Sequence, residues 1–442
     1  MSPHLRLVEE RSADADADAG AGAGALLLDG AVVVPRHGTE SLTGVERHDL
    51  DAHRALVGVR RACVGAAAGT LLAAIDEVHL TGRGGGHFPT AAKWRSVRTA
   101  GAAATVVANG AEGEPGSAKD AVLLQTRPHL VLDGLVSAME AVDAEEGVVW
   151  LHDGAWATAR SVSRALTERA AAGVLDPPIR VVLAPDRYLS GEATGIIRTL
   201  EGGPTLPRYV EDPARPWSVG ARPVLVNNVE TLARVGLLAT GSVAAYRPTS
   251  LLTVVSATHR VVVETDAATT FGEVVARAWT SPDGDEPQAV LLGGYGGSWV
   301  LWGRLRDLPV DADVLRRAGL SVGAGLVGPL PASACGLEES ASLLRYLAGQ
   351  SARQCGPCVF GLASVSALAD DLSGGRLTRG GRSRLARFMG EISGRGACRH
   401  PDGALRMLAS ALTAFEADVH RHRRGRTCGA PAFAVLPIPG QA

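Results

Sequence analysis

The stretch Thr81–Thr90 is rich in glycine and has the composition of an anion-binding loop. Its glycines can adopt positive φ values and bring the backbone close to a ligand. Pro89 and Thr90 have the pattern of a helix start, with Thr90 able to cap the helix. A glycine loop that runs into a helix N-terminus presents several N–H donors, so it could bind phosphate. An ordinary tight turn is the alternative, because a glycine-rich turn alone is a weak signal.

Cysteines form a second candidate site toward the end of the chain. Cys355 and Cys358 have C-x-x-C spacing, and Cys398 follows later in the sequence. Thiolates at this spacing are ligands for an iron–sulfur cluster or for zinc. Candidates for a further ligand are His400, Cys335 and Cys428. A cluster with an exogenous fourth ligand, a zinc site, and the absence of a metal are the alternatives.

Polar side chains follow two apolar runs that are typical of buried strands. The first run, Thr105–Asn109, leads into an acidic turn, and the second, beginning at Val224, leads into an amide pair. The residues concerned are Asn109, Glu112, Glu114 and Lys119 after the first, and Asn227, Asn228 and Thr231 after the second. Functional residues gather at such strand ends in α/β sheets. A solvated acidic turn is the alternative for the two glutamates.

The composition singles out the same stretches. Of 44 Lys+Arg residues only Lys93 and Lys119 are lysine, and the only asparagines are Asn109, Asn227 and Asn228. Rare residues kept against such a bias indicate chemistry that Arg or Asp cannot supply. Chance clustering is the alternative.

These stretches, in this order, resemble the flavin- and NADH-binding subunit of respiratory complex I, the 51-kDa or F-subunit family of NADH-quinone oxidoreductases. That family carries Gly-Arg-Gly-Gly-Ala-Gly-Phe-Pro-Thr-Gly-x-Lys-Trp, Asn-x-Asp-Glu-x-Glu-Pro-Gly-x-x-Lys-Asp and Glu-Ser-Cys-Gly-x-Cys-x-Pro-Cys-Arg-x-Gly. The stretch that contains Gly191 and Glu192 is similar to a further family motif. The resemblance covers roughly residues 75–430.

The resemblance implies a flavin-dependent oxidoreductase that passes a hydride from NADH to FMN and then single electrons to an iron–sulfur cluster, a 4Fe-4S type. It implies catalytic roles for Glu114 and Glu192. It implies that the cofactors are held by Gly82, Arg83, Gly84, Gly85, Gly86, Phe88, Lys93, Asn109, Glu112, Gly191, Asn227, Asn228 and Thr231. The implied cluster ligands are Cys355, Cys358 and Cys398, and we choose Cys428 as the fourth because a helical bundle could return it to that end.

Several positions depart from the family pattern. Ala111 and Ala193 replace carboxylates, His87 replaces a glycine, and Ala352 stands where the first cluster cysteine is expected. The Lys-Pro-Pro-aromatic segment of the nucleotide site is also missing. Two alternatives therefore stay open: an FMN and iron–sulfur electron-transfer protein that does not bind NADH, and a cofactor-free structural paralogue.

The elements that must position these residues suggest four regions. Residues 1–25 have low complexity and are expected to be disordered. Residues 26–240 are expected to form an α/β flavin- and nucleotide-binding domain, and residues 248–326 a ubiquitin-like β-grasp domain. Residues 335–428 are expected to form an α-helical iron–sulfur bundle.

Composition limits the cellular context. The chain has 442 residues and a net charge of −2, which gives no general attraction to nucleic acid. No apolar run approaches the roughly 20 residues of a membrane helix, and no secretory signal is evident. We expect a cytoplasmic protein, with peripheral attachment to a membrane complex left open. Expected partners are NADH and an electron acceptor such as a 2Fe-2S protein or a ferredoxin.

Overall fold

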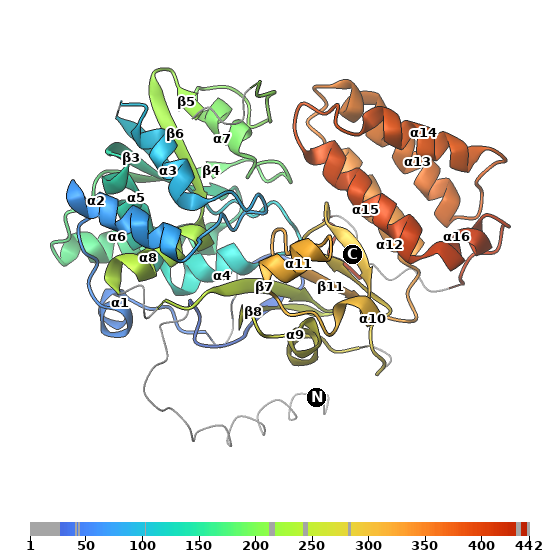
Figure 1. Ribbon diagram of the computed structural model, residues 1–442, viewed down its shortest axis with the longest axis horizontal. Helices are drawn as coiled ribbons and strands as arrows, with labels where there is room; N and C mark the ends of the chain where they lie inside the picture. Colours follow the sequence, from blue (N-terminus) through green and yellow to red (C-terminus); the bar gives the residue numbers. More distant parts are fainter. Residues whose placement is uncertain are drawn as a thin grey trace.

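The computed structural model describes residues 27–39, 42, 45–101, 103–211, 217–241, 246–281, 284–429 and 435–439. The predicted disordered tail, residues 1–25, lies outside these residues. Figure 1 shows an α/β region, a second sheet beside it, and a group of helices from the end of the chain. No helix in the described residues is long and apolar enough to cross a membrane.

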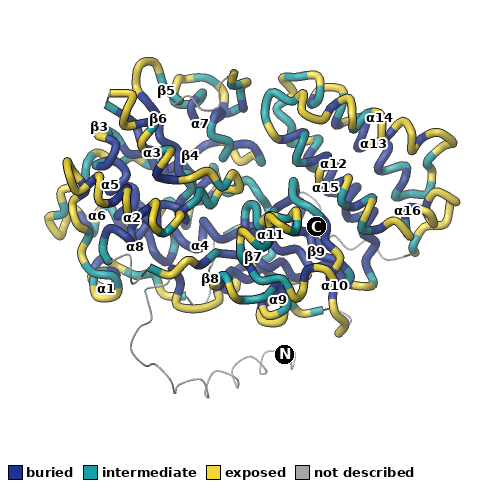
Figure 2. Tube along the Cα trace, in the orientation of Figure 1, coloured by how far each residue is buried: buried dark blue, intermediate teal, exposed yellow. Residues whose placement is uncertain are grey.

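The first sheet has five strands. In spatial order they are β4 (Ile179–Ala184), β3 (Ala144–His152), β2 (Ala104–Asn109), β6 (Arg222–Asn228) and β5 (Trp217–Val219). The first four are parallel, and β5 pairs with β6 in the antiparallel sense. Strands β2 and β6 are almost wholly buried, which explains their continuous apolar sequences. Figure 2 shows how far each part of the chain is buried, including β6.

Helices surround this sheet (Figure 1). They are α1 (Leu50–Val57), α2 (Ala66–Glu77), α3 (Thr90–Arg98), α4 (Lys119–Thr126), α5 (Pro128–Ala141), α6 (Trp156–Ala171), α7 (Ala193–Leu200) and α8 (Val229–Thr240). Helices α3, α4, α7 and α8 begin within the motifs described above, so the sheet edge and the helix N-termini position the same residues.

The second sheet has six strands. In spatial order they are β1 (Val32–Pro35), β8 (His259–Asp266), β7 (Thr249–Val255), β11 (Leu326–Leu330), β9 (Ala289–Leu292) and β10 (Ser298–Leu301). Its helices are α9 (Phe271–Ala278), α10 (Trp302–Leu305) and α11 (Ala312–Arg317). Strand β1 comes from the range assigned to the first predicted domain, but it pairs with β8 of this sheet. That pairing spans too many residues to be inferred from local sequence.

The end of the chain is helical. The helices are α12 (Gly336–Gly349), α13 (Leu362–Ser373), α14 (Gly381–Ile392), α15 (His400–Ala414) and α16 (Glu416–His422), with a π-helical turn at Pro357–Gly361. Leu344, Leu362 and Met407 belong to the buried core that these helices share with the facing side of the second sheet. This packing holds the cysteine-bearing loops against the rest of the protein.

Candidate active site

Strand register brings the two polar motifs to one sheet edge. Strand β2 ends at Asn109 and β6 ends at Asn228, and these two residues are direct partners in the parallel ladder. The glycine loop joins this edge, because the backbone N–H of Arg83 donates to Thr231 Oγ1 at 2.9 Å. The structure therefore gathers three segments that are far apart in the sequence.

The glycine loop closes on itself and presents an exposed backbone. Gly82 N donates to Phe88 O at 2.9 Å, and Gly84, Gly85 and Gly86 are exposed. His87 has a φ of 46°, a conformation in which glycine is favoured, which agrees with the glycine of the family motif. Phe88 is 57% exposed, so its ring is free to contact a ligand.

Helix α3 begins directly after this loop. The prediction that Thr90 caps this helix is wrong. Pro89 occupies the N-cap position, and Thr90 is the first helical residue. Its buried hydroxyl has no hydrogen-bond partner in the part of the chain that the structure describes. The N-terminal N–H groups of α3 consequently remain without a side-chain cap from the N-cap residue, as an anion site requires.

Lys93 lies in the first turns of α3 and is partly buried. Its ammonium group donates to the Val226 carbonyl and lies 5.2 Å from the centre of the Trp217 ring. Burial lowers the pKa of Lys93 from 10.5 to about 8. Among the described residues no carboxylate pairs with it, so a buried positive charge has only a carbonyl and a ring as partners. The dianionic phosphate of a nucleotide would supply the missing negative charge.

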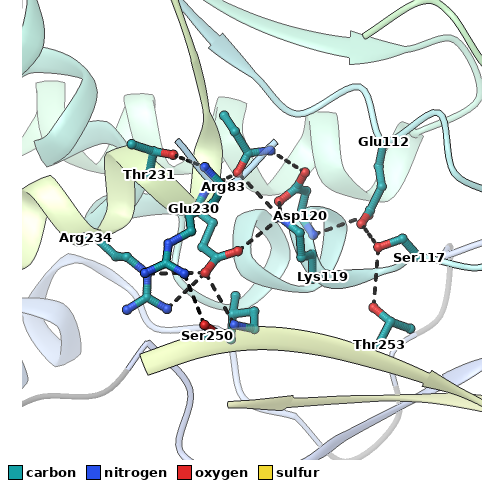
Figure 3. Close-up of polar contacts among 12 residues, drawn as sticks. Arg83, Glu112, Ser117, Lys119, Asp120, Glu230, Thr231, Arg234, Ser250 and Thr253 are labelled. Atoms are coloured by element: carbon teal, nitrogen blue, oxygen red, sulfur yellow. Dashed lines mark hydrogen bonds and ion pairs between the residues drawn. The ribbon is translucent and has the colours of Figure 1, made fainter. Parts of the chain in front are cut away.

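Lys119, the second lysine of the chain, is paired with carboxylates, unlike Lys93 (Figure 3). Lys119 pairs with Asp120 at 2.7 Å and with Glu230 at 3.1 Å, and Glu230 also pairs with Arg234 at 2.9 Å. Although burial alone would raise it, the positive charges around Glu230 lower its pKa to about 2. Asn228 Nδ2 donates to Asp120 Oδ2 at 2.6 Å, so this charge network fixes the orientation of the amide.

Glu112 is turned inward at the start of α4. Its carboxylate accepts from the Ser117 hydroxyl, from Asp120 N at 3.2 Å and from Ala121 N at 3.4 Å. Burial and the nearby Asp120 raise its pKa to about 7. The predicted flavin contact therefore also fixes the turn that leads into α4.

Glu114 lies between two cavities. It lines one of about 640 Å³ and another of about 340 Å³ that also contains Gly84 and Gly85 of the glycine loop. The Tyr188 hydroxyl donates to Glu114 Oε1 at 2.6 Å, and Tyr295 N donates to Oε2 at 2.9 Å. Burial raises the pKa of Glu114 to about 7.

Sequence reasoning did not assign roles to the two tyrosines that hold Glu114. Tyr295 lies in the turn Gly293–Gly297. Gly294 has a φ of 118°, and a Cβ there would lie 2.6 Å from Glu114 Oε1. In the sequence, the run of glycines around Tyr295 is the local signal that another segment could approach the backbone closely at this point.

Gly191 and Glu192 connect the sheet edge to α7. Asn109 Nδ2 donates to Gly191 O at 2.8 Å, and a Cβ at Gly191 would lie 2.4 Å from Ala111 O. Glu192 caps α7 by accepting from Gly195 N at 3.0 Å, and burial raises its pKa. The two residues thus have clear positioning roles beside the candidate cofactor edge.

Three thiols gather next to this edge. Burial raises the pKa of Cys358 to about 12, and the neighbouring thiols of Cys355 and Cys398 contribute to that increase. Burial also raises the pKa of Cys398, to which the negative charge of Glu192 adds. The three predicted cysteines are therefore close enough to influence one another electrostatically, and Glu192 at the predicted flavin site influences Cys398. Their three sulfur atoms are not all within 4.8 Å of one another, so their joint role as cluster ligands stays a prediction.

The choice of Cys428 as the fourth ligand of this group was wrong. Cys428 lies with Cys335 and His422, where all three ligand atoms are within 4.8 Å of one another. Cys335 occupies the N-cap position of α12, whereas Cys355 follows its C-terminus, and the 14 residues of α12 span about 21 Å. The chain after α16 therefore returns to the other end of the bundle. His400 also has a partner already, because its Nε2 lies 2.8 Å from Leu347 O.

The site thus combines an α/β sheet edge, a glycine loop, a partly buried lysine that pairs with no carboxylate among the described residues, and nearby cysteines. These features suit a nucleotide cofactor next to a thiolate-bound metal centre.

Comparisons with known proteins agree with a flavin site followed by an iron–sulfur site. Residues 75–237 match the model of the Nuo51 FMN-binding domain, and residues 338–422 match that of the NADH-ubiquinone oxidoreductase-F iron–sulfur binding region. The second F-type subunit of NADH-quinone oxidoreductase from Rhizobium meliloti is 29% identical over 377 residues, which cover 80% of this chain and 89% of that protein. The F-type subunit of the Escherichia coli enzyme is 29% identical over 385 residues, which cover 81% and 85%. Two regions of the chain thus match models of the NADH-quinone oxidoreductase F subunit, and the relatives named above are F subunits of that enzyme.

Solved structures of NAD+-reducing [NiFe]-hydrogenase have the same fold. The air-oxidised form superposes with a TM-score of 0.74 at 23% identity, over 90% of this chain and 71% of that chain. The H2-reduced form gives 0.71 at 24% identity, over 80% of this chain and 62% of the hydrogenase chain.

Proposed function

We propose that this protein oxidises NADH at an FMN and passes the electrons singly to an iron–sulfur cluster. The observation that carries the proposal is the set of hydrogen bonds that hold the loop before Cys355 against the segments around α7, where Tyr188 N donates to Gln350 Oε1 and Arg198 donates to Gln354 Oε1. The negative charge of Glu192, directly before α7, also acts on the thiol of Cys398.

The residues present suit an FMN phosphate. The exposed glycine backbone leads directly into the start of α3, whose N-cap residue makes no side-chain cap, and Lys93 lies in the first turns of the same helix without a carboxylate partner among the described residues. Bound there, FMN would supply two-electron to one-electron chemistry. Asn109, Asn228 and Thr231 already bond to neighbouring protein groups, so their proposed role is to hold the loop and the strand ends in place. Trp94 Nε1 likewise donates to Asn227 Oδ1 at 3.1 Å.

Glu114 and Phe88 are proposed to face the nicotinamide nucleotide. Both carboxylate oxygens of Glu114 already accept hydrogen bonds, which fix its position between the two cavities. Because both oxygens of Glu114 already have hydrogen-bond donors within the protein, neither needs a nucleotide as partner. This favours the second candidate function, an FMN and iron–sulfur carrier without NADH binding. Ala111 and Ala193, which replace family carboxylates, support that candidate too.

The helical region is proposed to carry electrons away from the flavin. Its loop before Cys355 contacts the flavin region directly: Tyr188 N donates to Gln350 Oε1 at 3.2 Å, and Arg198 donates to Gln354 Oε1 at 2.7 Å. These bonds fix the cluster loop against the segments around α7. Cys355, Cys358 and Cys398 would hold three irons of a 4Fe-4S cluster, and a non-cysteine or exogenous ligand would hold the fourth.

We also propose that β7–β11 form a ubiquitin-like β-grasp unit and that α12–α16 form the iron–sulfur bundle. The strand order β8-β7-β11-β9-β10 and the parallel pairing of β11 with β7 support the first assignment. Strand β1 extends this sheet at one edge. An electron acceptor such as a 2Fe-2S protein or a ferredoxin, and a cytoplasmic location, remain parts of the proposal.

An anaerobic titration of the purified holoprotein with NADH tests the function. We expect the flavin absorbance to bleach at stoichiometric NADH. A flavin that only dithionite reduces would replace the proposal with the carrier function. A protein that binds no flavin after expression with cofactor supply would identify a structural paralogue.

A further inference from the structure

A second group of metal-ligand side chains lies at the far end of α12. The Nε2 atom of His422 is 2.9 Å from Cys428 Sγ and 3.8 Å from Cys335 Sγ. Cys335 and His422 are buried and Cys428 is partly so. The three line a cavity of about 410 Å³, which leaves room beside them for a further small ligand.

The hydrogen bonds of His422 leave Nε2 as an electron-pair donor. Its Nδ1 lies 2.7 Å from the carbonyl oxygen of Ser373, so Nδ1 carries the proton and donates it. The backbone N–H of Cys428 points at Nε2 from 3.1 Å, which also requires an unprotonated Nε2. A histidine that donates one ring N–H to a backbone carbonyl and presents the other nitrogen is the arrangement found in metal-bound imidazoles.

We propose that Cys335, His422 and Cys428 bind a zinc ion. Two thiolates and one imidazole are a donor set that zinc prefers, and its tetrahedral geometry needs one more ligand. Asp418, whose carboxylate lies beside Cys428, or a water molecule in the cavity completes the set. The zinc replaces the contact between Cys428 N and His422 Nε2.

Such a zinc would have a structural role distinct from electron transfer. Cys335 precedes the start of α12, Ser373 ends α13, and His422 ends α16. One ion would therefore join the start of α12 to the end of α16 and fix the chain that follows α16, and His422 would link this site to α13 through its hydrogen bond to the Ser373 carbonyl. Its position at the opposite end of α12 from Cys355 separates it from the proposed cluster by about a helix length.

Metal content of the anaerobically purified full chain tests the site. We expect about one zinc per chain in addition to iron. Cys335→Ser and Cys428→Ser should each lower zinc at least about tenfold while flavin and iron remain. Cys355→Ser should lower iron and leave zinc unchanged, and Cys63→Ser, a buried thiol elsewhere, should change neither. Cobalt replacing zinc should give the visible absorption of thiolate-bound tetrahedral cobalt.

The opposite pattern would overturn the proposal. It fails if no zinc or cobalt binds, or if zinc follows Cys355→Ser and not Cys335→Ser. It also fails if peptide mass spectrometry finds a disulfide between Cys335 and Cys428 in protein prepared without oxidant. If the serine variants do not fold, His422→Gln and the cobalt spectrum of the wild-type chain decide, because both can be read without removing a thiol.

Discussion

Replacing Lys93 by methionine should have opposite effects on the empty protein and on flavin binding. Burial that lowers the pKa of Lys93 from 10.5 to about 8 corresponds to about 3 kcal/mol of unfavourable free energy for the charged side chain. Lys93→Met should therefore stabilise the apoprotein at pH 7 by up to about 3 kcal/mol. The loss of a charge-assisted bond to phosphate should weaken FMN binding about 10- to 100-fold.

The pKa of Lys93 also predicts the direction in which stability and FMN binding change with pH. Between the folded pKa of about 8 and the unfolded value, the unfolded chain binds more protons at this residue, so stability rises with pH. FMN binding should weaken over the same range, because the free protein loses the positive charge. Both slopes should decrease in Lys93→Met.

The assays are urea unfolding of the apoprotein and quenching of flavin fluorescence on binding, each from pH 7 to about 10. Arg95→Met, on an exposed position of the same helix, should change neither. Lys119→Met should destabilise by about 3–5 kcal/mol, because it leaves the buried Asp120 without its cation and removes one of the two cations that pair with Glu230. An apoprotein destabilised by Lys93→Met, or an unchanged affinity for FMN, would refute the reasoning.

Three further predictions concern the same site. Gly191→Ala should destabilise by about 1–3 kcal/mol in urea unfolding, because its Cβ would lie 2.4 Å from Ala111 O, whereas Gly390→Ala, with open space around it, should not. The folded pKa of Glu114, about 7, exceeds its unfolded value, so the wild type should lose stability as pH rises from 5 to 8. Glu114→Gln should not, and should therefore gain about 1–3 kcal/mol relative to the wild type over that range. Equal pH profiles of stability for the two proteins would contradict this. His87→Gly should relieve a strained φ of 46° and change the ratio of kcat/KM for NADH and NADPH, and identical kinetics with both donors would exclude a role in donor preference.

Much of the site could be predicted because its motifs are local. The glycine loop, the strand ends at Asn109 and Asn228 and the C-x-x-C pair each span a few residues, and a parallel sheet places strand ends together. The same locality let the C-x-x-C spacing predict Cys355 and Cys358 as ligands, and in the structure these two thiols interact with each other.

The contacts that were missed depend on packing between distant segments. Glu114 is held by Tyr188 and Tyr295, which come from different regions, and no spacing rule connects them. The position of Cys428 depends on how α15 breaks into α16 at Phe415, which decides the end of the bundle to which the chain returns. Strand β1 joins a sheet whose other strands begin more than two hundred residues later in the chain.

The most direct test of the electron path is low-temperature EPR of protein frozen after anaerobic reduction by NADH. The wild-type chain should show a reduced iron–sulfur signal together with a bleached flavin. Cys358→Ser should lose that signal and still bleach its flavin, whereas Cys428→Ser should keep both. A wild-type flavin that bleaches without any iron–sulfur signal, or a signal that survives in Cys358→Ser, would contradict transfer from NADH through the flavin to these three cysteines.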